Sequence, residues 1–235
     1  MSTVAIMQPY VLPYIGYFQL IAAVDKFIVY DDVNFIKSGW INRNNILVNN
    51  NPYLFTIPLE NASSFQLIKD TKVNIKLYLI WKDKFYRTVS QSYKKAPFFD
   101  EVNPLICSIF DNVTCDISNL AVNSLKEVCK YLKINTSILE TSQGYLNAHM
   151  KGQERVIDIC MQEGAANYIN PIGGLQLYSK EYFEKQKIKL SFIKPTAIEY
   201  KQFKGEFVPW LSIIDVLMFN SKEQVNVLIN NYELL

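Results

Sequence analysis

Residues 3–32 read TVAIMQPYVLPYIGYFQLIAAVDKFIVYDD, and their pattern indicates the type of fold. Its first five residues form an apolar run, which predicts a buried strand. The next segment, QPYVLPY, contains two prolines and is expected to be an extended loop. From Gly16 apolar residues recur at three and four positions, which predicts a helix, and residues 26–30 are β-branched and aromatic like a second strand. Strand, loop, helix and strand in this order open a parallel sheet.

Polar side chains follow both predicted strands. They are Gln8, Tyr10, Tyr14 and Tyr17 around the proline turn, and Asp31 and Asp32 after the second strand. Ligands of open parallel sheets bind beyond the carboxyl ends of the strands, so we expect the turn and the aspartates to share one crevice. Adjacent strand residues face opposite sides, so only one aspartate should line it. Such a carboxylate could act as a general base or bind magnesium.

The rest of the chain alternates between helical and strand patterns. Two runs within residues 40–58 flank Asn49–Asn51 and predict a hairpin, since asparagine tolerates positive φ. The expected helices cover residues 81–93, 99–110, 117–132, 153–163 and 181–187, and the expected strands residues 69–73, 138–139 and 190–193; helices are expected again from Pro209 onward, with Asp116 or Ser118 and then Ser221 as caps.

These patterns predict an α/β fold: a Rossmann-like parallel sheet flanked by helices, with a β-hairpin insertion and a helical C-terminal region. The chain has 235 residues. We interpret it as a single α/β domain over residues 1–235, within which residues 80–135 are a candidate helical subdomain.

A second polar cluster consists of Lys37, Trp40, Arg43 and Asn44. The planar fork of Arg43 could bind a carboxylate or phosphate, and Trp40 could stack on a base or sugar. In a continuous strand these two side chains would lie on opposite faces, so we do not expect them to meet unless a bulge intervenes.

Further candidates lie in the second half of the chain. They are Arg155, Asn170 before the pair Gly173–Gly174, Gln202, Ser212, Asp215 and Asn220. The two glycines permit close approach of a ligand to the backbone. Polar residues interrupt the apolar run PWLSIIDVLMFN, and buried polar groups require partners. His149 is the one histidine of the chain and lies in a polar stretch typical of a surface loop.

Composition excludes several classes of protein. The formal net charge of +2 does not favour a nucleic-acid groove or an anionic membrane partner. The start of the chain does not read as a signal peptide, and no apolar run reaches the ~18 residues of a membrane helix, so we expect a cytoplasmic protein. The four cysteines form no CxxC pair and are expected to be free thiols. The sequence leaves the metal requirement open.

The string PYIGY resembles the HIGH-type turn of nucleotidyltransferases, in which a strand leads through a turn into a helix. Tyr14 and Tyr17 stand where that motif has histidines. Phenols cannot replace imidazoles as cations or proton donors near pH 7. A HIGH-like nucleotidyltransferase therefore remains an alternative hypothesis, carried by the shape of the turn.

The whole chain resembles the WbqC-like protein family. The matching strings are AIMQPYVLPYIGYFQLIAAVDKFIVYDDVNF, GWINRN, KGQERVIDIC, YINPIGG and FVPWLSIIDVLMFN. The resemblance implies a glycyl- or aminoacyl-transferase that acts on a dTDP- or UDP-linked amino sugar in the biosynthesis of O-antigen, lipopolysaccharide or another surface polysaccharide. The implied donor is an activated glycine, carried as glycyl-tRNA, as a thioester or through ATP. A non-catalytic sugar-nucleotide-binding protein of the same pathway is a further alternative.

Roles for the candidate residues follow from this chemistry. Asp31 or Asp32 would accept the proton of the attacking amine, while Gln8, Tyr10 and backbone N–H groups would stabilise the oxyanion. Arg43 and Lys37 would hold the pyrophosphate. The residues expected to bind substrate are Tyr14, Tyr17, Lys37, Trp40, Arg43, Asn44, Arg155, Asn170, Gln202, Ser212, Asp215 and Asn220.

Overall fold

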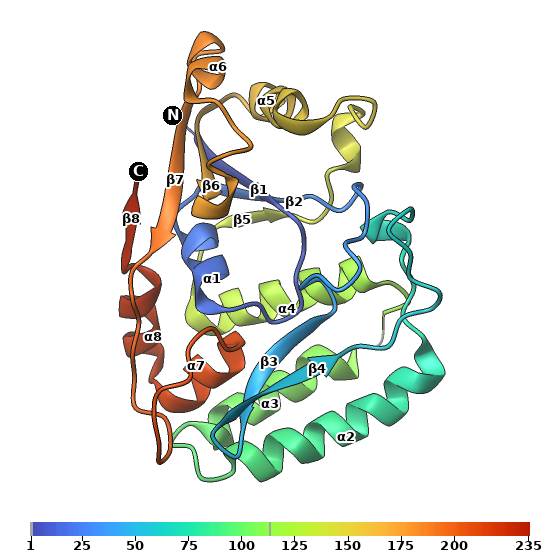
Figure 1. The fold of residues 1–235 in the computed structure, drawn as a ribbon, viewed down its shortest axis with the longest axis vertical. Helices are drawn as coiled ribbons and strands as arrows, with labels where there is room; N and C mark the ends of the chain where they lie inside the picture. The colour runs from blue at the N-terminus through green and yellow to red at the C-terminus, as the bar shows by residue number, and fades with distance from the viewer. Residues whose placement is uncertain (1, 113) are drawn as a thin grey trace.

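A computed structural model describes residues 2–112 and 114–235 of the chain (Figure 1). The strands are β1 (Ser2–Met7), β2 (Lys26–Val29), β3 (Arg43–Val48), β4 (Asn51–Thr56), β5 (Ser137–Leu139), β6 (Ala165–Pro171), β7 (Lys189–Pro195) and β8 (Tyr232–Leu234). The α-helices are α1 (Ile15–Ala22), α2 (Ile75–Tyr93), α3 (Phe99–Asp111), α4 (Ile117–Leu132), α5 (Gly152–Gln162), α6 (Lys180–Lys185), α7 (Ile213–Phe219) and α8 (Lys222–Ile229).

Six strands form the main sheet in the order β5-β2-β1-β6-β7-β8. The first five are parallel, and β8 pairs antiparallel with β7. The chain runs outward from β1 through β2 to β5, then crosses back and continues outward through β6 and β7. The direction of winding therefore reverses between β1 and β6, as in Rossmann-like sheets, and this confirms the predicted fold class.

Helices cover both faces of this sheet. Ala5 and Phe27 point into a core that contains α1, α4 and α8, whereas Val4 and Ile28 point into a second core with α5 and α6. Neighbouring residues of one strand thus enter different cores, as the two-residue period of a strand requires. The apolar runs of β1 and β2 are explained because both of their faces are buried.

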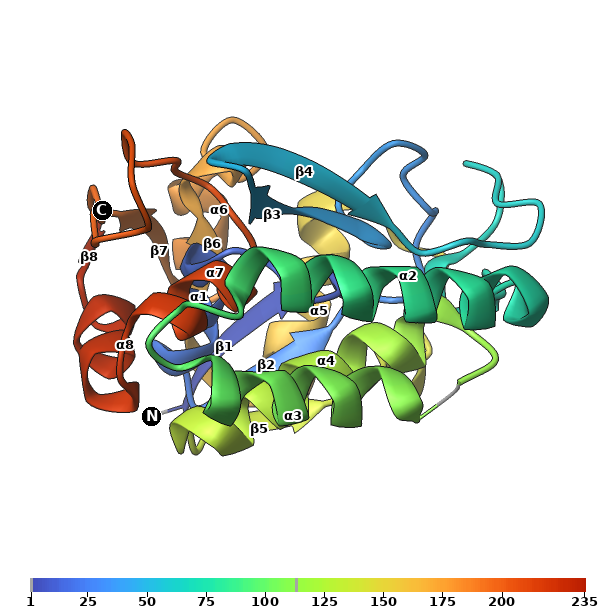
Figure 2. The same cartoon turned by 90° about the horizontal axis from the view of Figure 1, so that it is seen from below.

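The hairpin β3–β4 lies apart from the sheet and packs with α2 and α3 into one block (Figure 2). Asn49 and Asn50 form its turn with φ of 51° and 59°, which confirms the predicted hairpin. Side chains of α2, α3 and the hairpin belong to the same continuous core as Ala5 and Phe27. The domain division of the chain stays a prediction.

Several local expectations were wrong in detail. Residues 69–73 are not a strand: a 3₁₀ turn occupies Ile68–Asp70, followed by isolated bridges. The hairpin strand begins at Arg43 and not at Trp40. The helix expected from Pro209 begins at Ile213, with Ser212 as its cap, because the Ser212 hydroxyl accepts a hydrogen bond from the Ile214 N–H.

The predicted caps at Asp116 and Ser221 are confirmed; Ser221 forms a capping box with Gln224. Across residues 2–112 and 114–235, the helices include none with the length and apolar character needed to cross a membrane.

Candidate functional site

The proline turn between β1 and α1 is fixed by side chains from three other elements. Leu12 has a left-handed φ of 45°, which is rare for a bulky side chain. Its N–H donates to the Ser124 hydroxyl, 3.2 Å away. Its carbonyl accepts hydrogen bonds from the Asn44 amide at 2.8 Å and the Ser212 hydroxyl at 2.7 Å. Strained turns of this kind persist only where surroundings over-determine them, and they concentrate at functional sites.

The turn delivers Tyr14 to the start of α1. A Cβ atom added to Gly16 would lie 2.3 Å from the Tyr14 ring, so Gly16 leaves the space that this ring occupies. Tyr14 caps the helix without a side-chain hydrogen bond, and the first turn carries no acidic residue. The first backbone N–H groups of a helix lack partners within it, so this end of α1 is electropositive.

Two neighbouring cavities flank Tyr14, and we call them together the aromatic cleft. The larger has a volume of about 410 Å³ and is lined by Tyr14, Gly16, residues 195–200, residues 207 and 209–211, Ile15 and Val216. The smaller has about 180 Å³ and is lined by Tyr10, Pro13, Tyr14, Trp40, Asn44 and Trp210. Tyr14 and Trp210 line both, and their rings meet edge to face at 5.9 Å.

Trp210 stands between the two cavities in an unusual conformation. Its side chain is 71% exposed, and its φ of 61° is left-handed. For a residue of this size such backbone geometry costs about 1–3 kcal/mol, which other contacts must offset. The contacts come from Gln202, whose amide exchanges hydrogen bonds with both the N–H and the C=O of Val208. On the other side of Trp210, the Ser212 N–H donates to the Asn45 carbonyl at 2.8 Å.

Asp215 stabilises the loop that carries Trp210 through hydrogen bonds to its residues. It is fully buried and accepts hydrogen bonds from Tyr93 at 2.8 Å and from Tyr200 and Gln202, each at 2.7 Å. Burial raises the pKa of Asp215, and the three donors offset part of that rise. Burial also raises the pKa of Tyr93 and of Tyr200, so both phenols keep their protons at neutral pH.

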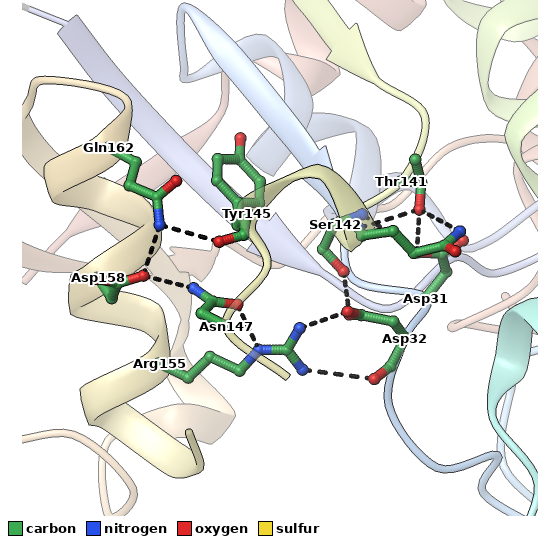
Figure 3. Close-up of polar contacts among 10 residues, drawn as sticks. Asp31, Asp32, Thr141, Ser142, Tyr145, Asn147, Arg155, Asp158 and Gln162 are labelled. Atoms are coloured by element: carbon green, nitrogen blue, oxygen red, sulfur yellow. Dashed lines mark hydrogen bonds and ion pairs between the residues drawn. The ribbon is translucent and has the colours of Figure 1, made fainter. Parts of the chain in front are cut away.

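The aspartates after β2 form a different kind of site, shown in Figure 3. Asp31 is 3% exposed, and its carboxylate accepts hydrogen bonds from the Thr141 hydroxyl at 2.8 Å, the Ser142 N–H at 3.1 Å and the Ser118 hydroxyl at 3.3 Å. These donors belong to the segment after β5 and to α4. Asp31 therefore joins the ends of two neighbouring strands to a helix, and it has little capacity left for a ligand.

Asp32 is equally well compensated. It is 8% exposed, pairs with the buried guanidinium of Arg155 at 2.5 Å and accepts a hydrogen bond from the Ser142 hydroxyl. Arg155 also donates to Asn147 at 2.9 Å and stacks on the Tyr30 ring at 4.9 Å. Asn147 passes the network on to Asp158 and Gln162 of α5 (Figure 3). Asp31, Asp32 and these partners are called the aspartate cluster below.

The aspartate cluster and the proline turn line different cavities, whereas the strand ends predict a shared one. Asp32 lines a separate, open cavity of about 410 Å³ together with Lys69, Gln143 and His149. The segment after β5 and the N-terminal half of α5 contact the aspartates directly, through the Ser142 N–H and the Arg155 guanidinium. Of the two aspartates Asp32 lines the cavity, and Asp31 is turned toward Thr141. His149 is exposed, as expected.

Arg43 and Trp40 also differ from expectation, because they do meet. The guanidinium of Arg43 lies 5.7 Å from the centre of the Trp40 ring. Residues 40–42 lie in a bend before the strand, so the strand alternation that would separate the two side chains does not apply. Arg43 donates to the carbonyls of Gly39 and Ser38. These bonds fix the turn that presents Trp40 to the smaller cavity.

The other predicted residues divide by their contacts. Tyr10, Tyr14, Trp40 and Asn44 line the aromatic cleft; Gln202, Ser212 and Asp215 brace the segments around it; Lys37 is exposed, and Asn220 donates to the Val216 carbonyl at the end of α7. Tyr17 is buried and donates to the Gln8 carbonyl at 2.7 Å. Asn170 donates to the Tyr168 hydroxyl, and its oxygen occupies the space that a Cβ at Gly174 would need. The binding roles of all these residues stay predictions.

The sequence did not single out Trp210 and Glu199, which both line the larger cavity. The apolar spacing after Pro209 predicts a helix that includes Trp210, and proline is common at the first position of a helix, so nothing in the sequence indicated that Trp210 lies outside it. Glu199 lies in a stretch without periodicity, so the sequence carried no signal for it. Among the described residues, no three His, Cys, Asp or Glu side chains are grouped as metal ligands.

Comparisons with known proteins gave one family match and one match to a curated protein. A family model described as the WbqC-like protein family matches residues 8–227. The chain is also 32% identical over 223 residues to the uncharacterized protein Rv1507c of Mycobacterium tuberculosis (strain ATCC 25618 / H37Rv), a match that covers 94% of each chain. The search of solved structures produced no match.

Proposed function

The chain belongs to the WbqC-like protein family, and from this premise we propose that it is a glycyl- or aminoacyl-transferase acting on a nucleotide-linked amino sugar. The product would be an N-acylated sugar nucleotide for O-antigen or a related surface polysaccharide. The observation that carries the proposal is the aromatic cleft: its two cavities adjoin the start of α1 at the carboxyl edge of a Rossmann-like sheet. This is where such sheets bind nucleotides.

The chemistry requires a nucleophilic amine and an activated acyl group. The amine nitrogen attacks the carbonyl carbon of the donor, so a C–N bond forms and the C–O or C–S bond to the carrier breaks. The nitrogen loses one proton, and the leaving oxygen or sulfur gains one. A residue that accepts the first proton and donates the second balances the step.

Glu199 is the carboxylate that lines the larger cavity, and we assign it the role of proton acceptor in place of Asp31 or Asp32. The carboxylates of the aspartate cluster are occupied by Arg155 and by hydroxyl donors. Burial raises the pKa of Tyr10 and of Tyr14, so both hold their protons and can donate hydrogen bonds to the developing oxyanion.

The HIGH-like alternative is weaker at one position. Tyr17, which stands where the second histidine of that motif would lie, is buried and bonded to the Gln8 carbonyl. Its one O–H donor is already used, so it cannot donate to a phosphate of a nucleotide without losing this bond.

The test is direct. Purified protein is incubated with a dTDP- or UDP-linked amino sugar and, in separate reactions, with glycyl-tRNA, a glycyl thioester, or glycine and ATP, and products are read by mass spectrometry. The expected product is heavier than the amino sugar nucleotide by one glycyl residue. Glu199→Gln should lower kcat at least 100-fold, whereas Glu206→Gln, a matched change of an exposed glutamate in the same loop, should not. If no donor yields a product, the transferase hypothesis is rejected, and the non-catalytic sugar-nucleotide-binding protein remains as the hypothesis.

A further inference from the structure

The smaller cavity of the aromatic cleft has a distinctive wall. Four of its six lining residues are aromatic: Tyr10, Tyr14, Trp40 and Trp210. They come from three segments, namely the proline turn, the turn before β3 and the loop after β7. Among the described residues, those that line it are all uncharged, so the cavity suits a flat, uncharged ring and not a phosphate.

The lining also contains one side-chain amide, that of Asn44. The Asn44 amide gives one N–H to the Leu12 carbonyl and accepts the Asn45 N–H on its oxygen. A primary amide has two N–H donors and two acceptor positions, so one of each remains. Adjacent donors and acceptors along one edge are what a nucleobase presents, and a buried amide of this kind can read them.

We propose that the smaller cavity is the nucleobase subsite of the enzyme, and that the ring of Trp210 forms part of its wall together with Tyr14 and Trp40. The inference rests on the proposed function, because the base is the one attached to the sugar that is acylated. It also fixes the direction of binding: the base lies beside Asn44, and the sugar amine points into the larger cavity, toward Glu199.

This assignment gives a function to the hydrogen bonds that hold the loop around Trp210. Trp210 is largely exposed yet held in a left-handed backbone conformation, with Val208 tied to Gln202 on one side and Ser212 tied to Asn45 on the other. Asp215 holds Gln202 in turn. Gln202 and Asp215 are thus positioning residues, which set the ring of Trp210 before a ligand arrives and so reduce the ordering cost of binding.

Tryptophan fluorescence tests the subsite. Trp40 and Trp210 line it, whereas Trp81 stacks on Phe85 in the α2 block. Titration with UMP and dTMP should change the emission of the wild-type protein, and ribose 5-phosphate should not. A variant with Trp40→Phe and Trp210→Phe retains Trp81 alone and should lose the response. Trp210→Ala should raise the Kd for the nucleotide about ten-fold or more, and Phe65→Ala, an exposed aromatic residue that does not line the cleft, should leave it unchanged.

A double-mutant cycle separates positioning from general stability. Gln202→Ala should raise the Kd several-fold when Trp210 is present and have no further effect in the Trp210→Ala background. Equal nucleotide affinity in wild type and Trp210→Ala, or an equal response to ribose 5-phosphate, would overturn the subsite. Nucleotide binding without any acylated product would reject the transferase and keep the subsite. Product formation with an unchanged KM in Trp210→Ala would keep the transferase and reject the subsite.

Discussion

Asp32 in the aspartate cluster and Asp215 beneath the aromatic cleft are both buried carboxylates, but they are compensated in opposite ways. Asp32 faces the buried cation Arg155, whereas Asp215 receives only neutral donors from Tyr93, Tyr200 and Gln202. The ion pair of Asp32 and Arg155 joins the end of β2 to α5. The neutral donors leave Asp215 with a raised pKa, and each of their hydrogen bonds can be removed separately by mutation. The first arrangement serves the scaffold, and the second serves the cleft.

The largest expected effect follows from breaking the charged pair. Arg155→Met removes the cation and leaves Asp32 buried without it, so the free energy of unfolding should fall by about 3–5 kcal/mol in urea titrations. Lys126→Met is the matched control, because Lys126 pairs with Glu140 at the surface and should contribute at most about 1 kcal/mol. Similar losses in the two variants would contradict the role given to the aspartate cluster.

The neutral cluster should respond less strongly. Tyr200→Phe removes one donor to Asp215 and should lower the free energy of unfolding by about 1.5–3 kcal/mol. Tyr232→Phe provides the comparison, since no hydrogen bond of its hydroxyl is found within residues 2–112 and 114–235. A Tyr200→Phe protein as stable as Tyr232→Phe would show that Asp215 does not depend on this phenol.

A pH series tests the sign of the Asp215 contribution. Burial raises its pKa above the ordinary value of 3.8, so the native state binds more protons than the unfolded state from pH 3.8 up to the raised pKa. The free energy of unfolding should therefore fall as pH rises through that window. Subtracting the curve of Asp215→Asn isolates this slope, and a difference that increases with pH would contradict the assignment.

The smallest effect on stability is expected at Gly16. Gly16→Ala should push the Tyr14 ring out of place while changing the free energy of unfolding by no more than about 1 kcal/mol, because alanine also favours the helix. Nucleotide affinity in the cleft should fall several-fold. Gly173→Ala adds a methyl group into open space and should change affinity little. Calorimetric titration of both variants measures the contrast.

Periodicity and composition were sufficient for the fold. The apolar runs of β1 and β2, the spacing in α1 and the asparagine turn at residues 49–50 each reflect local physics, and the structure confirms them. Two strands were not predicted: β6, whose residues AANYINP form neither an apolar run nor a strict alternation, and the antiparallel edge strand β8, whose three residues are too few to show a period. The 3₁₀ turn at Ile68–Asp70 was mistaken for a strand because short runs do not separate the two.

The site was harder to predict than the fold, since it depends on contacts between distant segments. Ser212 and Asp215 are candidates because they interrupt an apolar run, and Gln202 is a candidate because it matches a polar position of the family; the structure gives each of them partners. The left-handed Trp210 left no trace in the sequence, because tertiary contacts impose its backbone conformation. The ends of the predicted strands place Asp31 and Tyr10 at one edge of the sheet, but they carry no information on the distant residues Thr141, Ser142 and Arg155 that bind the aspartates.

We infer that the aromatic cleft, and not the aspartate cluster, binds the substrate. A crystal structure of the protein soaked with a UDP-linked amino sugar would show which of the two regions is occupied. We expect electron density for a base between Trp40 and Trp210, with the sugar directed toward Glu199. Density seated beside Asp32 and His149, with the cleft empty, would contradict it.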